Sequence, residues 1–145
     1  MGKGNKDKGR IKSPQRNTSK HLKQVEEVAD SQNQKLRFSF EHLTSTKNFT
    51  AKDCNYQQLQ DCLNKLRILS SKTWKEVHQE HRHKGGCEFI DQGSISAPIP
   101  KDVVTPDVRI MVFRMSGLAP MAGFRDSKNI YQVVWLDPKF KLYDH

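Results

Sequence analysis

Long apolar runs and paired cysteines are both missing from this sequence. Only 34% of its 145 residues are hydrophobic, and no uncharged apolar stretch approaches the roughly 18 residues that a membrane span needs. The three cysteines are an odd number without the spacing of a disulfide framework, which favours a reducing compartment. The basic amino terminus has no apolar stretch behind it and does not resemble a secretory signal. We therefore expect a cytoplasmic protein that is neither transmembrane nor disulfide-stapled.

Acidic residues are scarce at the amino terminus. Residues 1–23 carry eight Lys or Arg and one Asp, a net charge of +7, whereas the other 122 residues carry 17 basic and 15 acidic side chains, or +2. With few apolar side chains to offset its ordering entropy, the segment 1–20 is predicted to be disordered. We predict a basic arm over 1–35, with a weak helix at about 19–34, in front of one domain over 36–145.

A basic arm attracts polyanions, and nucleic acid is the commonest of these in a cytoplasm. Such binding would depend strongly on salt and little on sequence. The alternative is that the arm only keeps the protein soluble. If the arm contacts RNA, the contacting side chains are expected to be Lys3, Lys6, Lys8, Arg10, Lys12 and Arg16.

The body alternates between helical and strand-like patterns. Residues 36–40 alternate apolar and polar side chains, which predicts a half-buried strand. From residue 55 to 69 apolar residues recur at steps of three and four, which predicts a helix with one apolar stripe. Thr73 followed by Glu76 predicts a capping box and a second helix that ends at Gly85-Gly86.

Strand signals dominate the last third of the chain. Residues 89–107 contain three prolines and are predicted to be an irregular connection. The runs 108–115, 120–126 and 130–136 are predicted to form an antiparallel meander, with a polar turn at 126–129. The predicted fold class is α+β, with a small antiparallel sheet of one early strand and this meander, packed by two helices.

Two groups of side chains are of types that can bind a metal ion or act as a nucleophile. His78, His81, His83 and Cys87 are zinc-ligand residue types, but their spacing is not that of a zinc finger, and we interpret them as part of a solvated cationic helix end. Cys87 is the cysteine with activating neighbours, although a structural role is the alternative. We assign no metal and no cofactor.

Arginines on the predicted meander form a third group. Arg109, Arg114 and Arg125, near Tyr131 and further aromatic and histidine residues, could hold a phosphodiester and move protons on it. Arg109 and Arg114 have opposite parity on one strand and must face opposite sides of the sheet. The alternative is an ordinary solvated sheet face.

The carboxyl-terminal segment also carries a family resemblance. Residues 123–143, GFRDSKNIYQVVWLDPKFKLY, resemble the ending of small bacterial and prophage proteins that close on a V-W-x-D-P-x-H-x-L-Y pattern. The order of elements is similar to that of the RelE-like toxins, the superfamily of RelE, YoeB and HigB. This sequence departs from the pattern at Phe140, where the pattern has His, and only Glu88 loosely matches the glutamate of the YoeB branch.

The resemblance implies a metal-independent endoribonuclease that cleaves messenger RNA, often on the ribosome, with a cognate antitoxin as partner. In it, Arg109 or Arg114 would supply the cation of the first meander strand and Arg125 that of the next. Tyr143 and His145 would take part in proton transfer or base stacking. The residues that would bring further contacts to RNA are Lys84, His81, His83 and Tyr131.

Three functions therefore remain open from the sequence. The first is a toxin-like endoribonuclease that uses the 2′-OH of RNA as nucleophile. The second is a non-catalytic RNA-binding or phage-defence accessory protein on the same fold. The third is a protein-interaction module whose arm merely binds anions.

Overall fold

The computed structural model describes residues 15–81 and 84–144. The chain separates into two compact units, Met1–Asp30 and Ser31–His145. In the first unit the helix α1 (Gln15–Asn33) begins earlier than the sequence predicted, because residues 15–20 are helical and not disordered. Its Leu22 and Val25 side chains are exposed. The rest of the predicted arm, residues 1–14, lies outside the described residues.

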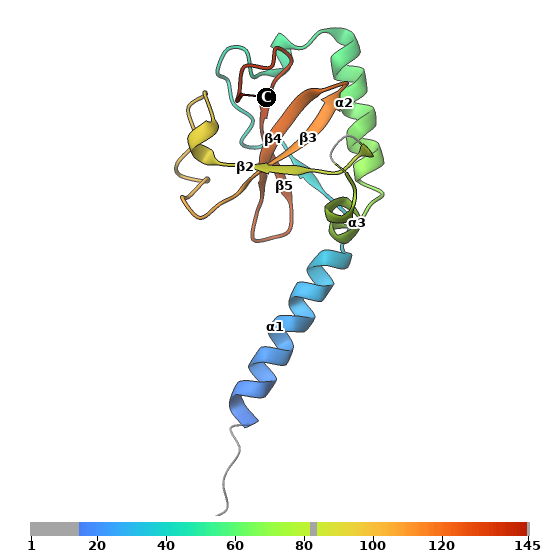
Figure 1. The fold of residues 1–145 in the computed structure, drawn as a ribbon, viewed down its shortest axis with the longest axis vertical. Helices are drawn as coiled ribbons and strands as arrows, with labels where there is room; N and C mark the ends of the chain where they lie inside the picture. The colour runs from blue at the N-terminus through green and yellow to red at the C-terminus, as the bar shows by residue number, and fades with distance from the viewer. Residues whose placement is uncertain (1–14, 82–83, 145) are drawn as a thin grey trace, which may run out of the picture. The chain divides into compact units, whose positions relative to one another are not determined.

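The second unit is built on one five-stranded sheet in the order β1-β5-β4-β3-β2, which confirms the α+β class (Figure 1). Its strands are β1 (Phe38–Ser39), β2 (Glu88–Ile90), β3 (Ile110–Ser116), β4 (Ala119–Arg125) and β5 (Tyr131–Leu136). The predicted meander is present, since β3 pairs antiparallel with β4 and β4 with β5. Two features differ from the prediction. β1 pairs parallel with β5, so the sheet is mixed, and β2 lies within the segment predicted to be irregular.

The two main helices of this unit begin at side-chain caps. Asn55 accepts from the Gln58 amide at 2.8 Å and starts α2 (Tyr56–Leu69). Thr73 accepts from the Glu76 amide at 3.2 Å and starts α3 (Trp74–Gln79), as predicted. Short 3-10 turns, η1 (Ala51–Asp53) and η3 (Gln92–Ser94), lie in the connections.

The helix α3 is shorter than predicted, because its cap is Glu80 and not the Gly85-Gly86 pair. The glycines instead shape the loop that follows. Gly85 has φ +95°, and a Cβ on Gly86 would lie 2.1 Å from the Glu80 carbonyl oxygen. The expected cationic last turn of this helix therefore does not exist: His81 and Lys84 lie in the loop, and residues 82–83 are outside the described part of the chain.

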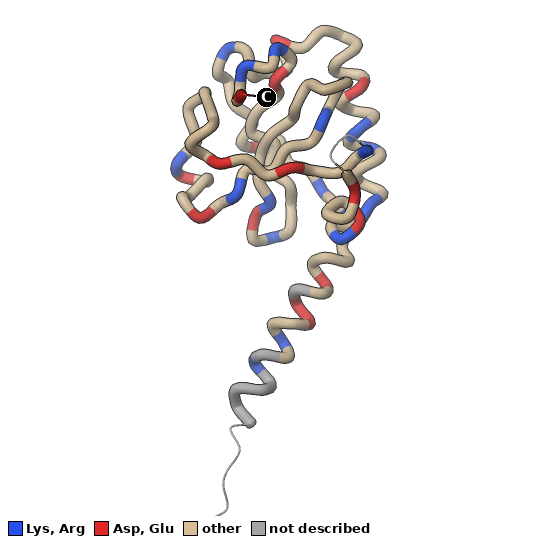
Figure 2. Tube along the Cα trace, viewed as in Figure 1, with Lys and Arg blue, Asp and Glu red and all other residues tan. Residues whose placement is uncertain are grey.

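Charges of both signs are interspersed along the second unit, as Figure 2 shows. A cation in this unit is therefore distinguished by its neighbours and not by membership of one broad basic face. The part of the chain that the structure describes contains no helix long and apolar enough to cross a membrane.

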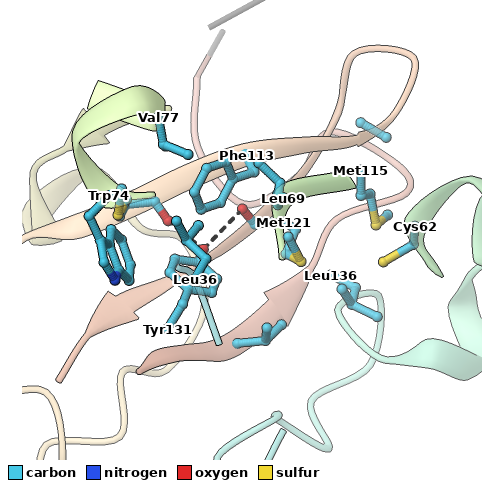
Figure 3. Close-up of a cluster of buried hydrophobic side chains, with 13 residues drawn as sticks. Leu36, Cys62, Leu69, Trp74, Val77, Phe113, Met115, Met121, Tyr131 and Leu136 are labelled. Atoms are coloured by element: carbon cyan, nitrogen blue, oxygen red, sulfur yellow. Dashed lines mark hydrogen bonds between the residues drawn. The ribbon is translucent and has the colours of Figure 1, made fainter. Parts of the chain in front are cut away.

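The sheet separates two hydrophobic clusters. Side chains of α2 and α3, such as Leu69, Trp74 and Val77, pack with Phe113 and Tyr131 on one face (Figure 3). The second cluster lies on the opposite face and includes Val112, Ala122, Val134, Trp135 and Leu142. The predicted stripe of α2 is only partly used for this packing. Cys62 and Leu69 are buried, but the Tyr56 side chain is 77% exposed and Leu63 is 71% exposed.

A bulge in β5 shifts the register of the last strand pair, because Val134 is the extra residue between Val133 and Trp135. The register between β4 and β5 shifts between Ala122 and Gly123. A Cβ on Gly123 would lie 1.8 Å from the Gln132 carbonyl oxygen, so the close backbone approach requires glycine here. Beyond the bulge Arg125 pairs with Tyr131. The predicted turn follows, closed by the hydrogen bond from the Asp126 amide to the Ile130 carbonyl at 2.9 Å.

Candidate nucleic-acid interface

A cleft of about 670 Å³ lies where α3 meets the ends of three sheet strands. Its lining brings together Arg109 and Arg125, which the sequence analysis proposed, with His78 and Phe89, which it did not. We call this site, defined by His78, Phe89, Arg109 and Arg125, the arginine cleft. It comes from residues up to 47 positions apart in the sequence, from His78 to Arg125.

Strand register places these side chains on one face. Phe89 of β2 pairs with Met111 of β3, and paired residues of an antiparallel ladder point to the same side. Arg109 has the same parity as Met111 and so belongs to the Phe89 side. On α3, Trp74 and His78 are one turn apart, which directs both side chains along one side of that helix.

Five side chains form a continuous stack along the cleft. The Arg109 guanidinium carbon lies 3.7 Å from the centroid of the Phe89 ring. The Phe89 and His78 rings are nearly parallel, with centroids 5.9 Å apart and an interplanar angle of 11°. His78 is 6.2 Å from Trp74, whose ring carries the Arg125 guanidinium carbon at 4.2 Å. The result is an aromatic ladder with a cation at each end, and both contacts are cation–π interactions.

The two arginines differ in how tightly they are held. Arg125 donates from Nη1 to Gln32 Oε1 at 2.9 Å, from Nη2 to the Ser31 carbonyl at 3.2 Å, and from Nε to Asn129 Oδ1. Arg109 is exposed and has no hydrogen bond or ion pair to any residue that the structure describes. Arg125 is thus a fixed charge in the wall, whereas the Arg109 guanidinium is available to a ligand.

The surroundings of His78 favour its neutral form. Burial lowers its pKa below the usual 6.5, and the positive charges of Arg125 and Arg109 lower it further. Its Nδ1 lies 4.0 Å from the Sγ atom of Cys87. Burial raises the pKa of that thiol to about 11, so Cys87 is protonated and not a nucleophile at neutral pH. A neutral imidazole beside two arginines can accept a proton.

Arg114 and Tyr143, also predicted as catalytic, gather on the other side of the sheet around Glu88. Arg114 Nη2 lies 2.7 Å from Glu88 Oε1 in a mostly buried ion pair, and the Tyr143 hydroxyl donates to the same oxygen at 3.1 Å. Burial and the Glu88 charge raise the pKa of Tyr143 to about 12. The sheet separates this group from Arg109 and Arg125, so the predicted catalytic residues cannot act on one phosphodiester together.

The residues that were predicted to contact RNA differ in burial and location. Tyr131 is fully buried and donates its hydroxyl to the Met111 carbonyl at 2.7 Å, so the prediction that it contacts RNA is wrong. His81 and Lys84 are exposed in the loop after α3 and do not line the cleft. Arg16 lies in α1. Outside the described residues are Lys3, Lys6, Lys8, Arg10, Lys12, His83 and His145.

Sequence reasoning missed His78 and Phe89 as cleft residues. The one available signal for His78 was its i, i+4 spacing from Trp74 behind the Thr73 cap, which places both on one helix side. No comparable signal marked Phe89, because β2 is only three residues long. Among the described residues, no three His, Cys, Asp or Glu side chains are placed to hold a metal ion.

Comparison with known proteins adds no assignment to this geometry. No protein-family model, no curated protein and no solved structure matches the chain. The resemblance to RelE-like toxins thus stays an expectation from sequence.

Proposed function

We propose that this protein is an endoribonuclease that binds RNA in the arginine cleft and cleaves it without a metal ion. The observation that carries the proposal is the placement of two arginines and a neutral histidine around one cavity. Arginine is the side chain best suited to phosphate, and an imidazole with a pKa below 6.5 can act as a base at pH 7.

In the proposed reaction the phosphodiester lies against Arg109, with the fixed charge of Arg125 nearby. His78 removes the proton of the ribose 2′-OH, and the 2′ oxygen attacks the adjacent phosphorus. The bond from phosphorus to the 5′ oxygen breaks, which leaves a 2′,3′-cyclic phosphate. The 5′ oxygen takes up a proton from water to become a 5′-OH, and His78 returns its proton to the solvent. The arginines stabilise the extra negative charge of the transition state. DNA lacks the 2′-OH and is not a substrate.

The resemblance to RelE-like toxins extends the proposal to its biological setting. On that basis the substrate is messenger RNA, free or on the ribosome, and a cognate antitoxin protein restrains the activity. The basic residues near the amino terminus add contacts to the RNA backbone that depend on salt.

The test uses the purified full-length chain with an end-labelled single-stranded RNA in the presence of EDTA. We expect cleavage to cyclic-phosphate ends, and no cleavage of the same oligonucleotide with 2′-deoxyribose throughout. His78→Gln should lower the cleavage rate by about 100-fold or more, as expected for loss of a general base. Lys52→Ala, which removes an exposed cation of η1 outside the cleft, is the matched control and should cleave like the wild type.

A second function is favoured by one observation. Arg125 donates three hydrogen bonds, to Gln32, Ser31 and Asn129, which is typical of a structural cation and suits a site that binds RNA without cleaving it. Under this alternative the wild type binds RNA without producing cyclic-phosphate ends, and Arg109→Ala weakens binding. Intact RNA and no measurable binding would overturn both functions.

A further inference from the structure

A second cavity adjoins the arginine cleft on the side of β2 and the loop before β3. It has a volume of about 460 Å³ and shares Phe89, Asp107, Val108 and Arg109 with the cleft. Its other walls include Asp91 and Pro106. The volume lies within the range of small-molecule sites in proteins. Arg109 is thus common to both cavities: His78 and Arg125 line the cleft, Asp91 lines the second cavity, and the Asp107 carboxylate lines both.

The wall that carries Asp107 is held in a defined shape. Gln92 Nε2 donates to the Thr105 carbonyl at 2.8 Å and to the Val108 carbonyl at 2.6 Å. The Val108 amide donates to the Thr105 carbonyl at 3.0 Å. The Thr105 hydroxyl donates to Asp107 Oδ1, and this hydrogen bond lowers the pKa of Asp107, so the carboxylate is charged at neutral pH. The second cavity is therefore preformed.

We propose that the second cavity is a subsite for an unpaired nucleobase that presents an amino group, next to the phosphate held in the arginine cleft. The inference rests on the proposed binding of RNA and names the RNA that is preferred. Arg109 faces Asp91 and Asp107 in the second cavity, whereas the cleft adds Arg125 and has Asp126 in place of Asp91, so a phosphate is favoured in the cleft. The negative charges of Asp91 and Asp107 attract a base that carries an amino group.

The stacking geometry supports a base in this position. One face of the Arg109 guanidinium covers the Phe89 ring, and because Arg109 is exposed, its other face is open to a flat ligand. Arginine planes commonly stack on unpaired bases of RNA. Aspartate accepts a hydrogen bond from the N4 amino group of cytosine. Uracil has an oxygen in place of that amino group, so the same carboxylate repels it.

The test compares two 2′-O-methyl heptanucleotides, which cannot be cleaved by 2′-OH attack. One is all uridine and the other carries a single central cytidine. Fluorescence anisotropy at fixed ionic strength should show roughly 10-fold tighter binding of the cytidine oligonucleotide, the size of one good base contact. Asp107→Asn keeps an oxygen for the Thr105 hydroxyl and adds an amide donor for uracil. It should reduce the preference to within about 2-fold. Asp102→Asn, an exposed acid of the same connection that does not line the cavity, is the control and should keep the preference.

The outcomes separate this inference from the proposed function. A wild type that binds both oligonucleotides equally, or an Asp107→Asn variant that keeps the full preference, overturns the base subsite and leaves RNA binding intact. A wild type that binds neither oligonucleotide overturns the subsite and the RNA-binding function together. A cytidine preference that Asp107→Asn removes and Asp102→Asn retains establishes the subsite.

Discussion

Replacing Arg125 with alanine should destabilise the folded protein as well as weaken its binding of RNA. The side chain makes three hydrogen bonds, to Gln32, Ser31 and Asn129, and one cation–π contact with Trp74. Each hydrogen bond contributes about 0.5–1.5 kcal/mol, and the cation–π contact about 0.5–1 kcal/mol. Because the contacts share one partly exposed side chain and are not additive, we expect Arg125→Ala to lower the free energy of unfolding by about 2–4 kcal/mol.

The assay is equilibrium unfolding in urea, followed by the fluorescence of the two tryptophans, Trp74 and Trp135. Arg109→Ala is the matched control, because Arg109 makes a single cation–π contact with Phe89 and no hydrogen bond within the described residues. Its loss should cost less than about 1 kcal/mol. If Arg125→Ala unfolds within about 0.5 kcal/mol of the wild type, the view of Arg125 as a structural cation in the cleft wall is refuted.

Further predictions concern three other residues, His78, Gly123 and Glu88. If His78 is the base, the cleavage rate will rise with pH through a pKa below 6.5 and then level off, and His78→Gln will remove that dependence. Because the pKa of His78 is lower in the folded than in the unfolded chain, the unfolded chain binds the proton more readily. The free energy of unfolding should therefore fall as the pH drops below about 6.5. In urea unfolding at several pH values, His78→Gln should reduce this fall. Gly123→Ala should prevent folding, as judged by far-UV circular dichroism, because its Cβ would lie 1.8 Å from the Gln132 carbonyl oxygen, whereas Gly93→Ala meets nothing within 4 Å and should fold normally. Glu88→Gln should lower the free energy of unfolding by about 3 kcal/mol, since it leaves the mostly buried Arg114 without a counter-charge. Glu41→Gln, at an exposed position, is its control. Equal losses of unfolding free energy in the two variants would contradict this prediction.

Local signals account for the elements that were predicted well. The Thr73 cap, the turn after Asp126 and the three strand-like runs of the meander each depend on residues a few positions apart, and each is present in the structure. Two elements were not predicted from the sequence, because no local residue pattern specifies them. β2 is a three-residue strand that exists because β3 offers it a partner edge. The end of α3 at Glu80 depends on the loop that returns past it, where Gly86 touches the Glu80 carbonyl.

The same division applies to the candidate site. Alternation along one strand was enough to place Arg109 and Arg114 on opposite faces, and the structure confirms this. Only the tertiary structure decided which of them joins Arg125 and which pairs with Glu88. That choice depends on the register of β2 against β3 and on the β5 bulge opposite Gly123, which align residues far apart in the chain. Periodicity within a segment determines the face on which a side chain lies, but its neighbours across the sheet follow from packing that no single segment contains.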